Sequence, residues 1–415
     1  MIDDQSMLDK NNYTDRDYVT NLASTGFDFL KTTQEKIWLQ PTSALSSIIE
    51  NSDNLDLDAV RFILDTNGRS ADPQAMPVLL KSALERSYIQ PYAENNGTLD
   101  NLLDILLQKW EGSEKSEWVN KFPRQLAAYA VIHAMAPESV YDVFRVLEKH
   151  DLDLNHRDLY DHTLLHLFSF NPMITEYLMD RGFDPNHREG RYGHTPLCTL
   201  CGYVNLLELY TTDPASIYEM YGNIMRSAEI LLQHGAEVNL TAREPIAAYN
   251  LGVMEDTNLV TLLHMAAKTT LSQPRTLVEL LLEHGAAPNA RNAKDQTMLH
   301  TACITGIKSQ NDPEQMIRSY VSSGGDINAK DYEHNTALHL IAEMYNKTPT
   351  ECVENIYKLL LKYGADPELT NCKNRRPWEM CSMKKQKRLK KIEKEASYAA
   401  WSMDMLSDGI DEFVR

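Results

Sequence analysis

The sequence predicts an all-α protein built from stacked helix pairs that are joined by short turns. The main observation is a four-residue phrase (TLLH, TPLC, TLLH, TMLH and TALH) that begins at Thr163, Thr195, Thr261, Thr297 and Thr336. A second phrase follows each of these and ends an apolar run at Gly182, Gly235, Gly285, Gly324 and Gly364. Self-similarity at a period of roughly 30–40 residues indicates a repeat array. The chain also lacks the alternating Val- and Thr-rich segments that would predict a sheet.

Each recurring Thr is expected to begin the first helix of a pair. Its hydroxyl can accept a hydrogen bond from an amide that the opening turn leaves unpaired. Pro196 follows Thr195 at the first helical position, where a missing N–H group has no consequence. We expect the Leu two residues after each Thr to point into the stack. The His beside that Leu could bridge to backbone groups of the adjoining turn.

Each recurring Gly is expected to end the second helix of a pair. A left-handed residue at this position favours Gly, because Gly has no Cβ atom. The next residues, as in Asp184-Pro185-Asn186 and Pro288-Asn289, are typical of a turn toward the following unit. The two phrases together therefore predict both ends of every helix pair.

These phrases resemble the ankyrin repeat family, whose unit is a β-turn finger followed by two antiparallel helices. The resemblance implies an ankyrin-repeat solenoid over residues 121–383, with a basic and then acidic helical tail or cap at 384–415. Only Gly235 ends a helix within the long interval between Thr195 and Thr261. That interval is therefore interpreted as one repeat with insertions at 205–225, between its helices, and at 241–258, before the next finger. A degraded sixth start at Arg376–Glu379 is expected to close the array.

The region 1–120 is expected to be helical but divergent. Upstream of Thr163, apolar phrases typical of second helices recur, and each follows a plausible first helix, but no Thr-x-Leu-His start is present. The first helices lie at 43–51, 75–87 and 124–136, and the second helices at 60–68, 102–112 and 143–155. Two interpretations stay open: divergent ankyrin-like repeats, or a separate helical domain packed against the array.

By the resemblance, a protein partner would bind at the finger tips and along the first helices on the concave face. The candidate contact residues are Tyr160, Arg191, Tyr192, Arg291, Lys294, Tyr332 and Glu333. Tyrosine suits a contact role because it buries a large area with few rotatable bonds. The alternative is that each finger Tyr packs on the neighbouring finger. The two insertions are further candidates, since long loops on a rigid scaffold often carry function.

Composition narrows the classes of partner. The formal net charge is −18 at pH 7, and the residues before Lys384 carry all of the negative excess. Such a body repels nucleic-acid phosphate and anionic membranes, so we expect no nucleic-acid partner. The longest apolar stretch, 126–136, is too short to span a bilayer. We expect a monomer.

The six cysteines do not have the spacing of a disulfide framework. In a chain of this length they predict free thiols in a reducing compartment, so we expect a cytoplasmic protein. Cys198 and Cys201 have the spacing of a metal or redox half-site. Their positions in the repeat favour packed small residues instead. Most of the 13 histidines occupy repeated positions, so neither a metal nor a cofactor is expected.

No phosphate loop, HExxH pair, nucleophile elbow or kinase loop is present, so the leading hypothesis is a non-catalytic interaction module. The rival hypothesis is an enzymatic domain within residues 1–120, although that region contains neither Cys nor His. The divergent N-terminal repeats and the irregular insertions also resemble those of ankyrin proteins that pathogens deliver into host cells. Such an origin would place the chain in host cytosol. The basic run Lys384–Lys391 could be a nuclear import signal, an acidic-partner or membrane-surface contact, or a solvated helix.

Overall fold

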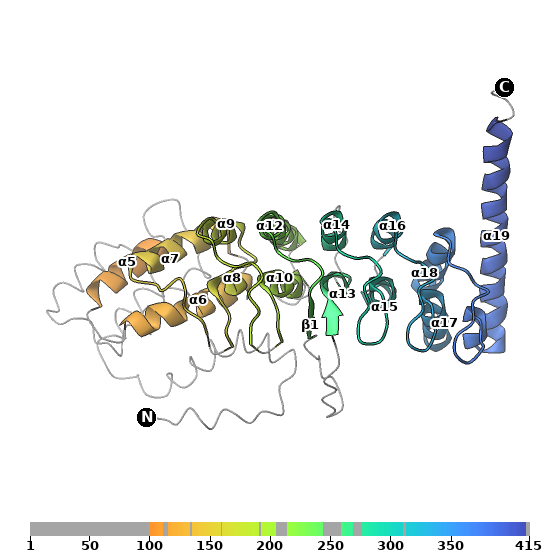
Figure 1. Cartoon of the computed structure of the whole chain (residues 1–415), viewed down its shortest axis with the longest axis horizontal. Helices are drawn as coiled ribbons and strands as arrows, with labels where there is room; N and C mark the ends of the chain where they lie inside the picture. The colour runs from red at the N-terminus through yellow and green to blue at the C-terminus, as the bar shows by residue number, and fades with distance from the viewer. Residues whose placement is uncertain are drawn as a thin grey trace. The chain divides into compact units, whose positions relative to one another are not determined.

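The computed structural model describes residues 99–110, 115–132, 135–158, 160–190, 192–204, 214–243, 259–268, 276–309 and 313–411. These residues form α-helices joined by short turns, with one small sheet (Figure 1). The predicted all-α architecture of stacked helix pairs is confirmed. The helices expected at 43–51, 60–68 and 75–87 lie outside the described residues.

The chain divides into two compact units. The helices of the first unit are α5 (Leu99–Lys109), α6 (Lys115–Ile132), α7 (Pro137–Lys149), α8 (Leu164–Leu167), α9 (Pro172–Asp180), the first residues of α10 (Pro196–Val204) and α12 (Pro214–Gln233). Helices α5, α7, α9 and α12 pack one against the next, and α6 packs against both α7 and α8. The unit therefore has two helix layers.

The second unit has the same two-layer plan. Its elements are β1 (Thr241–Arg243), β2 (Leu259–Thr261), α13 (Leu262–Ala266), α14 (Leu277–Glu283), α15 (Met298–Ser309), α16 (Glu314–Ser322), α17 (Ala337–Lys347), α18 (Glu351–Lys362), the 3₁₀ helix η2 (Pro377–Met380) and α19 (Met383–Asp411). Helices α13, α15, α17 and η2 form one layer, and α14, α16, α18 and α19 form the other (Figure 1).

Side-chain caps explain where several second helices begin. The Asn171 side chain accepts a hydrogen bond from the Ile174 amide at 3.1 Å at the start of α9. At the start of α14, the Thr276 hydroxyl accepts from the Glu279 amide at 3.2 Å, and the Glu279 carboxylate accepts from the Thr276 amide at 3.0 Å. This reciprocal pair satisfies two amides that the helix leaves unpaired.

The predicted left-handed helix ends are confirmed. The five glycines have positive φ angles: +80° at Gly182, +86° at Gly235, +85° at Gly285, +83° at Gly324 and +93° at Gly364. Asp151 takes the same conformation, with φ +67°, one residue after the position that ends α7. The α6–α7 pair therefore ends as the later pairs do, without the glycine that marks them in sequence.

Two segments that the sequence analysis interprets as insertions differ from that expectation. Of the segment 205–225, the residues from Pro214 onward are helical and form the first turns of α12, so they extend a second helix. Of the segment 241–258, the first three residues form β1, which pairs antiparallel with β2 in the register Thr241↔Thr261. This two-stranded sheet was not predicted, because strands of three residues are too short to show an alternating pattern. Residues 205–213 and 244–258 lie outside the described ranges.

The second unit ends with η2 and α19. The Glu379 carboxylate accepts from the Arg376 amide at 2.7 Å, and Pro377 is buried. Leu389 and Ile392 of α19 are buried, and α19 contacts both α18 and η2. Thus η2 occupies the place of a first helix and α19 that of a second helix.

Candidate functional site

Five of the described fingers are each built around one anchor residue whose side chain organises the turn. In four fingers the anchor oxygen accepts hydrogen bonds from the amides two and four residues later, at 2.8–3.1 Å. These anchors are Asp158, Asn292, Asp331 and Asn371. In a fifth finger Glu189, which is one methylene longer, accepts from amides three and five residues later, at 2.5 and 3.1 Å. The sequence analysis missed the anchors, because Asp, Asn and Glu serve the same purpose and no single letter recurs.

Backbone hydrogen bonds join neighbouring finger tips within each unit. In the first unit the Gly190 amide donates to the Tyr160 carbonyl at 2.8 Å. In the second unit the amide of Ala293 donates to Leu259 at 3.0 Å, and that of Tyr332 donates to Lys294 at 3.2 Å. The tips are therefore held in fixed order along each unit.

The recurring His adds a second bridge between fingers. Its Nε2 lies 2.8–3.3 Å from a carbonyl oxygen of the next finger. A carbonyl cannot donate, so Nε2 carries the proton and Nδ1 accepts. The hydroxyl of the same repeat's Thr donates to Nδ1 at 2.8–3.1 Å, and in three of these repeats the amide of that Thr also donates to Nδ1, at 3.2–3.3 Å. The histidines in this arrangement are His166, His264, His300 and His339.

The predicted His bridge is thus confirmed. In these four repeats the Thr hydroxyl also donates to the His, which was not predicted, and at Thr163 and Thr336 it lies in a reciprocal capping box with the third helical residue, as a helix-starting Thr should. Thr195 behaves as predicted, because Cys198 replaces the His and the Thr195 hydroxyl accepts from the Cys198 amide at 3.4 Å. Burial lowers the pKa of His166 to about 3 and also lowers the pKa values of His264, His300 and His339. All four rings are therefore neutral at pH 7.

Two of the predicted contact residues lie side by side on the second unit and face solvent. The Tyr332 side chain is 64% exposed, and Lys294 is also exposed. The backbone bond between these residues fixes their spacing, and the anchors Asn292 and Asp331 hold the two turns. Leu259, 47% exposed, belongs to the finger beside Lys294. Aromatic, cationic and aliphatic groups are therefore presented together.

Other predicted contact residues are engaged within the protein. The Arg124 guanidinium lies 5.2 Å from the Tyr160 ring centroid, and the Tyr192 ring stacks on His194 at 5.5 Å. Arg291 donates to the carbonyls of Asp295 and Lys330, at 2.7 and 2.6 Å. The Glu333 carboxylate accepts from the Asn335 side chain at 3.1 Å. Arg191 lies outside the described residues.

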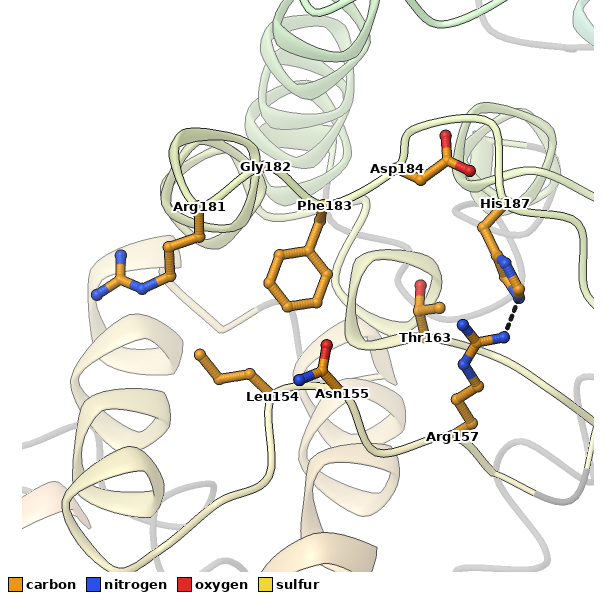
Figure 2. Close-up of a pocket in the computed structure, with 9 residues that line it drawn as sticks. All are labelled: Leu154, Asn155, Arg157, Thr163, Arg181, Gly182, Phe183, Asp184 and His187. Atoms are coloured by element: carbon orange, nitrogen blue, oxygen red, sulfur yellow. Dashed lines mark hydrogen bonds between the residues drawn. The ribbon is translucent and has the colours of Figure 1, made fainter.

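A hollow of about 210 Å³ in the first unit lies between the turn before the finger of Asp158 and the turn after α9 (Figure 2). Phe183 projects into it beside Leu154. In three later repeats the position of Phe183 holds a buried alanine: Ala236, Ala286 and Ala365. A phenyl ring is too large for that position and stays half-exposed.

The cationic side chains around the hollow are engaged within the protein. Arg157 lies 3.0 Å from His187 Nε2 (Figure 2) and 3.0 Å from an Asp161 carboxylate oxygen. The Arg181 guanidinium stacks on the Tyr177 ring at 3.5 Å. The hollow is also smaller than the roughly 300–1,000 Å³ of typical ligand pockets. Its geometry therefore fits a turn with an oversized side chain better than a small-molecule site.

In the described part of the chain, no cluster of three or more His, Cys, Asp or Glu side chains could hold a metal ion. All six cysteines are free thiols, and burial raises the pKa of Cys198 and that of Cys303, the latter to about 12. Among the described helices, none is long and apolar enough to cross a membrane.

The ankyrin repeat family model matches residues 258–293 and 333–372. Similar curated proteins include human ankyrin repeat and SOCS box protein 6, which is 33% identical over 150 residues. That match covers 35% of this chain and 30% of that protein. Human B-cell lymphoma 3 protein is 34% identical over 114 residues, or 28% of this chain and 22% of that protein. The chain thus spans less than a third of the length of these relatives.

Human NF-kappa-B inhibitor zeta is 33% identical over 105 residues, which cover 24% of this chain and 13% of that protein. Among solved structures, the ankyrin repeat domain of Bcl-3 aligns with a TM-score of 0.40 and 20% identity, over 64% of this chain and 97% of that one. The ankyrin repeat domain of human ASB11 aligns with a TM-score of 0.44 and 17% identity, over 64% and 96%.

Proposed function

Because the chain is an ankyrin repeat protein, we propose that it is a non-catalytic interaction module that binds a partner protein through its fingers. It would act as a scaffold, adaptor or inhibitor. Ankyrin repeats generally mediate contacts between proteins, and the anchored fingers of this chain supply fixed, exposed side chains for that purpose. The contact surface assigned to the second unit is the Lys294–Tyr332 pair, with Leu259 beside it.

The observation that carries the proposal is the exposure of Tyr332 on a rigid turn. An exposed aromatic side chain is available to a partner, and its position is fixed before binding by the anchor Asp331 and by the backbone bond to Lys294. Binding would therefore order few additional groups, which favours affinity. Tyr160 and Tyr192 are weaker candidates, because their rings already pack within the fingers.

The alternative of an enzymatic domain within residues 1–120 has less support. The described part of that region is 99–110 and 115–120, which belongs to helices α5 and α6. Those helices bury apolar side chains such as Leu103, Leu106 and Val119. Their role there is packing, and the remainder of residues 1–120 lies outside the described residues.

A reducing compartment such as the cytoplasm is proposed from the six free thiols. For nuclear import through Lys384–Lys391, the support is weaker, because several of these side chains are bound to the rest of the protein. The relatives described above are mammalian proteins, and they lend no support to a pathogen effector in host cytosol.

The proposal is tested by affinity capture with the whole chain and with a double variant, Lys294→Ala with Tyr332→Ala. A Tyr218→Ala variant is the matched control, because Tyr218 is 60% exposed but belongs to helix α12 of the first unit and to no finger. Buried contact aromatics commonly dominate an interface, so the double variant should bind a captured partner at least about tenfold more weakly. If the double variant captures a partner as well as the Tyr218→Ala control does, the finger site is refuted.

A further inference from the structure

Helix α19 is attached to the last repeat by one face. Leu389 and Ile392 are buried, and the buried Tyr357 hydroxyl of α18 donates to the Glu393 carboxylate. Three cationic side chains of α19 add to this attachment. Lys385 donates to the Asn346 carbonyl at 2.5 Å, Arg388 pairs with Glu354 at 2.6 Å, and Lys390 lies 3.5 Å from the Trp378 ring centroid.

The opposite face of α19 carries a row of lysines, here called the lysine stripe: Lys384, Lys387, Lys391 and Lys394. They are spaced by three or four residues, which places them on one side of an α-helix over a length of about 15 Å. All four are exposed, whereas Leu389 and Ile392 lie roughly half a turn away and are buried. Within the run Lys384–Lys391, some basic side chains therefore contact the last repeat, and others lie on the exposed face of the helix.

Along residues 384–395 of α19, seven basic side chains stand against two acidic ones, Glu393 and Glu395. Glu393 is turned toward Tyr357, and the Glu395 carboxylate lies 3.6 Å from the Lys391 ammonium group. This concentration of positive charge stands out in a chain whose formal net charge is −18. An anionic partner that met only this face would be attracted, because the interaction is local at physiological ionic strength.

We propose that the lysine stripe is a binding site for an acidic polypeptide segment whose carboxylates repeat at helical spacing. A narrow segment would contact the stripe alone. A membrane or a nucleic-acid duplex presents a broad anionic surface, and the formal net charge of −18 disfavours association of this chain with such a surface. The site is separate from the fingers and does not depend on their proposed role.

The test uses the full chain and a labelled, Ala-rich helical peptide of about 20 residues that carries four glutamates spaced like the four lysines. A second peptide has the same composition with the glutamates spread around the helix. We expect the matched peptide to bind more tightly than the spread one, with an affinity that falls as salt is added. Equal affinities for the two peptides, or no binding at low ionic strength, would overturn the proposal.

A charge-reversal variant, with Lys384→Glu, Lys387→Glu and Lys391→Glu, should bind the matched peptide at least about tenfold more weakly. The control reverses Lys347, Lys358 and Lys362, which are exposed on α17 and α18, and should stay within about twofold of the parent. Circular dichroism confirms that both variants are folded. An equal loss in the control, or tighter binding of duplex DNA or phosphatidylserine vesicles than of the peptide, would also overturn the proposal.

Discussion

At the scale of single residues, buried polar groups hold the fingers in place. A neutral His accepts from its own Thr and donates to the next finger, and in five described fingers an Asp, Asn or Glu anchor accepts two amides. The anchor Asp158 is half-buried beside His162 and Arg124, which lower its pKa to about 2 against the opposing effect of burial. These arrangements satisfy backbone groups that a short turn would otherwise leave unpaired.

A first prediction follows from Gly325. A Cβ atom at this position would lie 2.5 Å from the Tyr320 ring, which is fully buried and hydrogen-bonded through its hydroxyl to Asn289 and Asp326. Gly325→Ala should therefore destabilise the second unit by about 1–3 kcal/mol, measured by urea unfolding. The control Gly222→Ala lies in α12 with no atom within 4 Å of the new Cβ, and it should stabilise by up to about 1 kcal/mol. Equal effects of the two changes would contradict this account.

A second prediction concerns pH. In the unfolded chain the four bridging histidines take up protons below about pH 6.5, whereas in the folded state their pKa values are lower, about 3 for His166. Between these values the unfolded state binds more protons, so the free energy of unfolding should fall as pH falls from about 6.5. Glu393, whose pKa burial raises to about 7, acts in the opposite sense: its contribution is lost as pH rises through 7.

Because four histidines oppose one glutamate, thermal midpoints should decrease between pH 7 and pH 5. A His166→Gln variant should start less stable and show a smaller decrease over that range. A midpoint of the parent that is flat or rises toward pH 5 would contradict the neutral-bridge assignment.

At the scale of elements, the recurring Thr and Gly predicted the helix boundaries well, because caps and left-handed ends depend on local chemistry. The anchors could not be predicted, because Asp, Asn and Glu all serve. The hydrogen bond from each Thr hydroxyl to its His could not be predicted either, because the orientation of that His depends on a carbonyl of another finger. The length of α12 was missed because its first turns, from Pro214, carry no repeat phrase. The exposure of Tyr332 and the packing of Tyr160 likewise depend on neighbouring fingers.

The attachment of α19 gives a third prediction. Replacing Leu389 and Ile392 by Ala removes buried side chains that pack against the last repeat, each change costing about 2–5 kcal/mol locally. Hydrogen exchange of the α18 amides should then become faster, while Lys387→Ala, on the exposed face, should leave it unchanged. Unaltered exchange in the double variant would show that α19 does not cover this end.

At the scale of the whole molecule, stability should come mainly from contacts between successive helix pairs. The sequence therefore predicts that a fragment of residues 155–383 folds without the N-terminal region. That fragment loses the packing of Phe144 against Phe168 at one end and of Leu389 and Ile392 at the other. A longer fragment, 137–411, should have a higher thermal midpoint by circular dichroism. No cooperative transition in either fragment would contradict the nearest-neighbour description.

The central claim is that this chain binds a protein partner through the fingers of its second unit. The most direct measurement is a calorimetric titration of a captured, purified partner against the parent, Tyr332→Ala and Tyr218→Ala, with folding checked by circular dichroism. The account predicts that Kd rises at least about tenfold for Tyr332→Ala and stays within about twofold for Tyr218→Ala. Equal Kd values for the parent and Tyr332→Ala would contradict it.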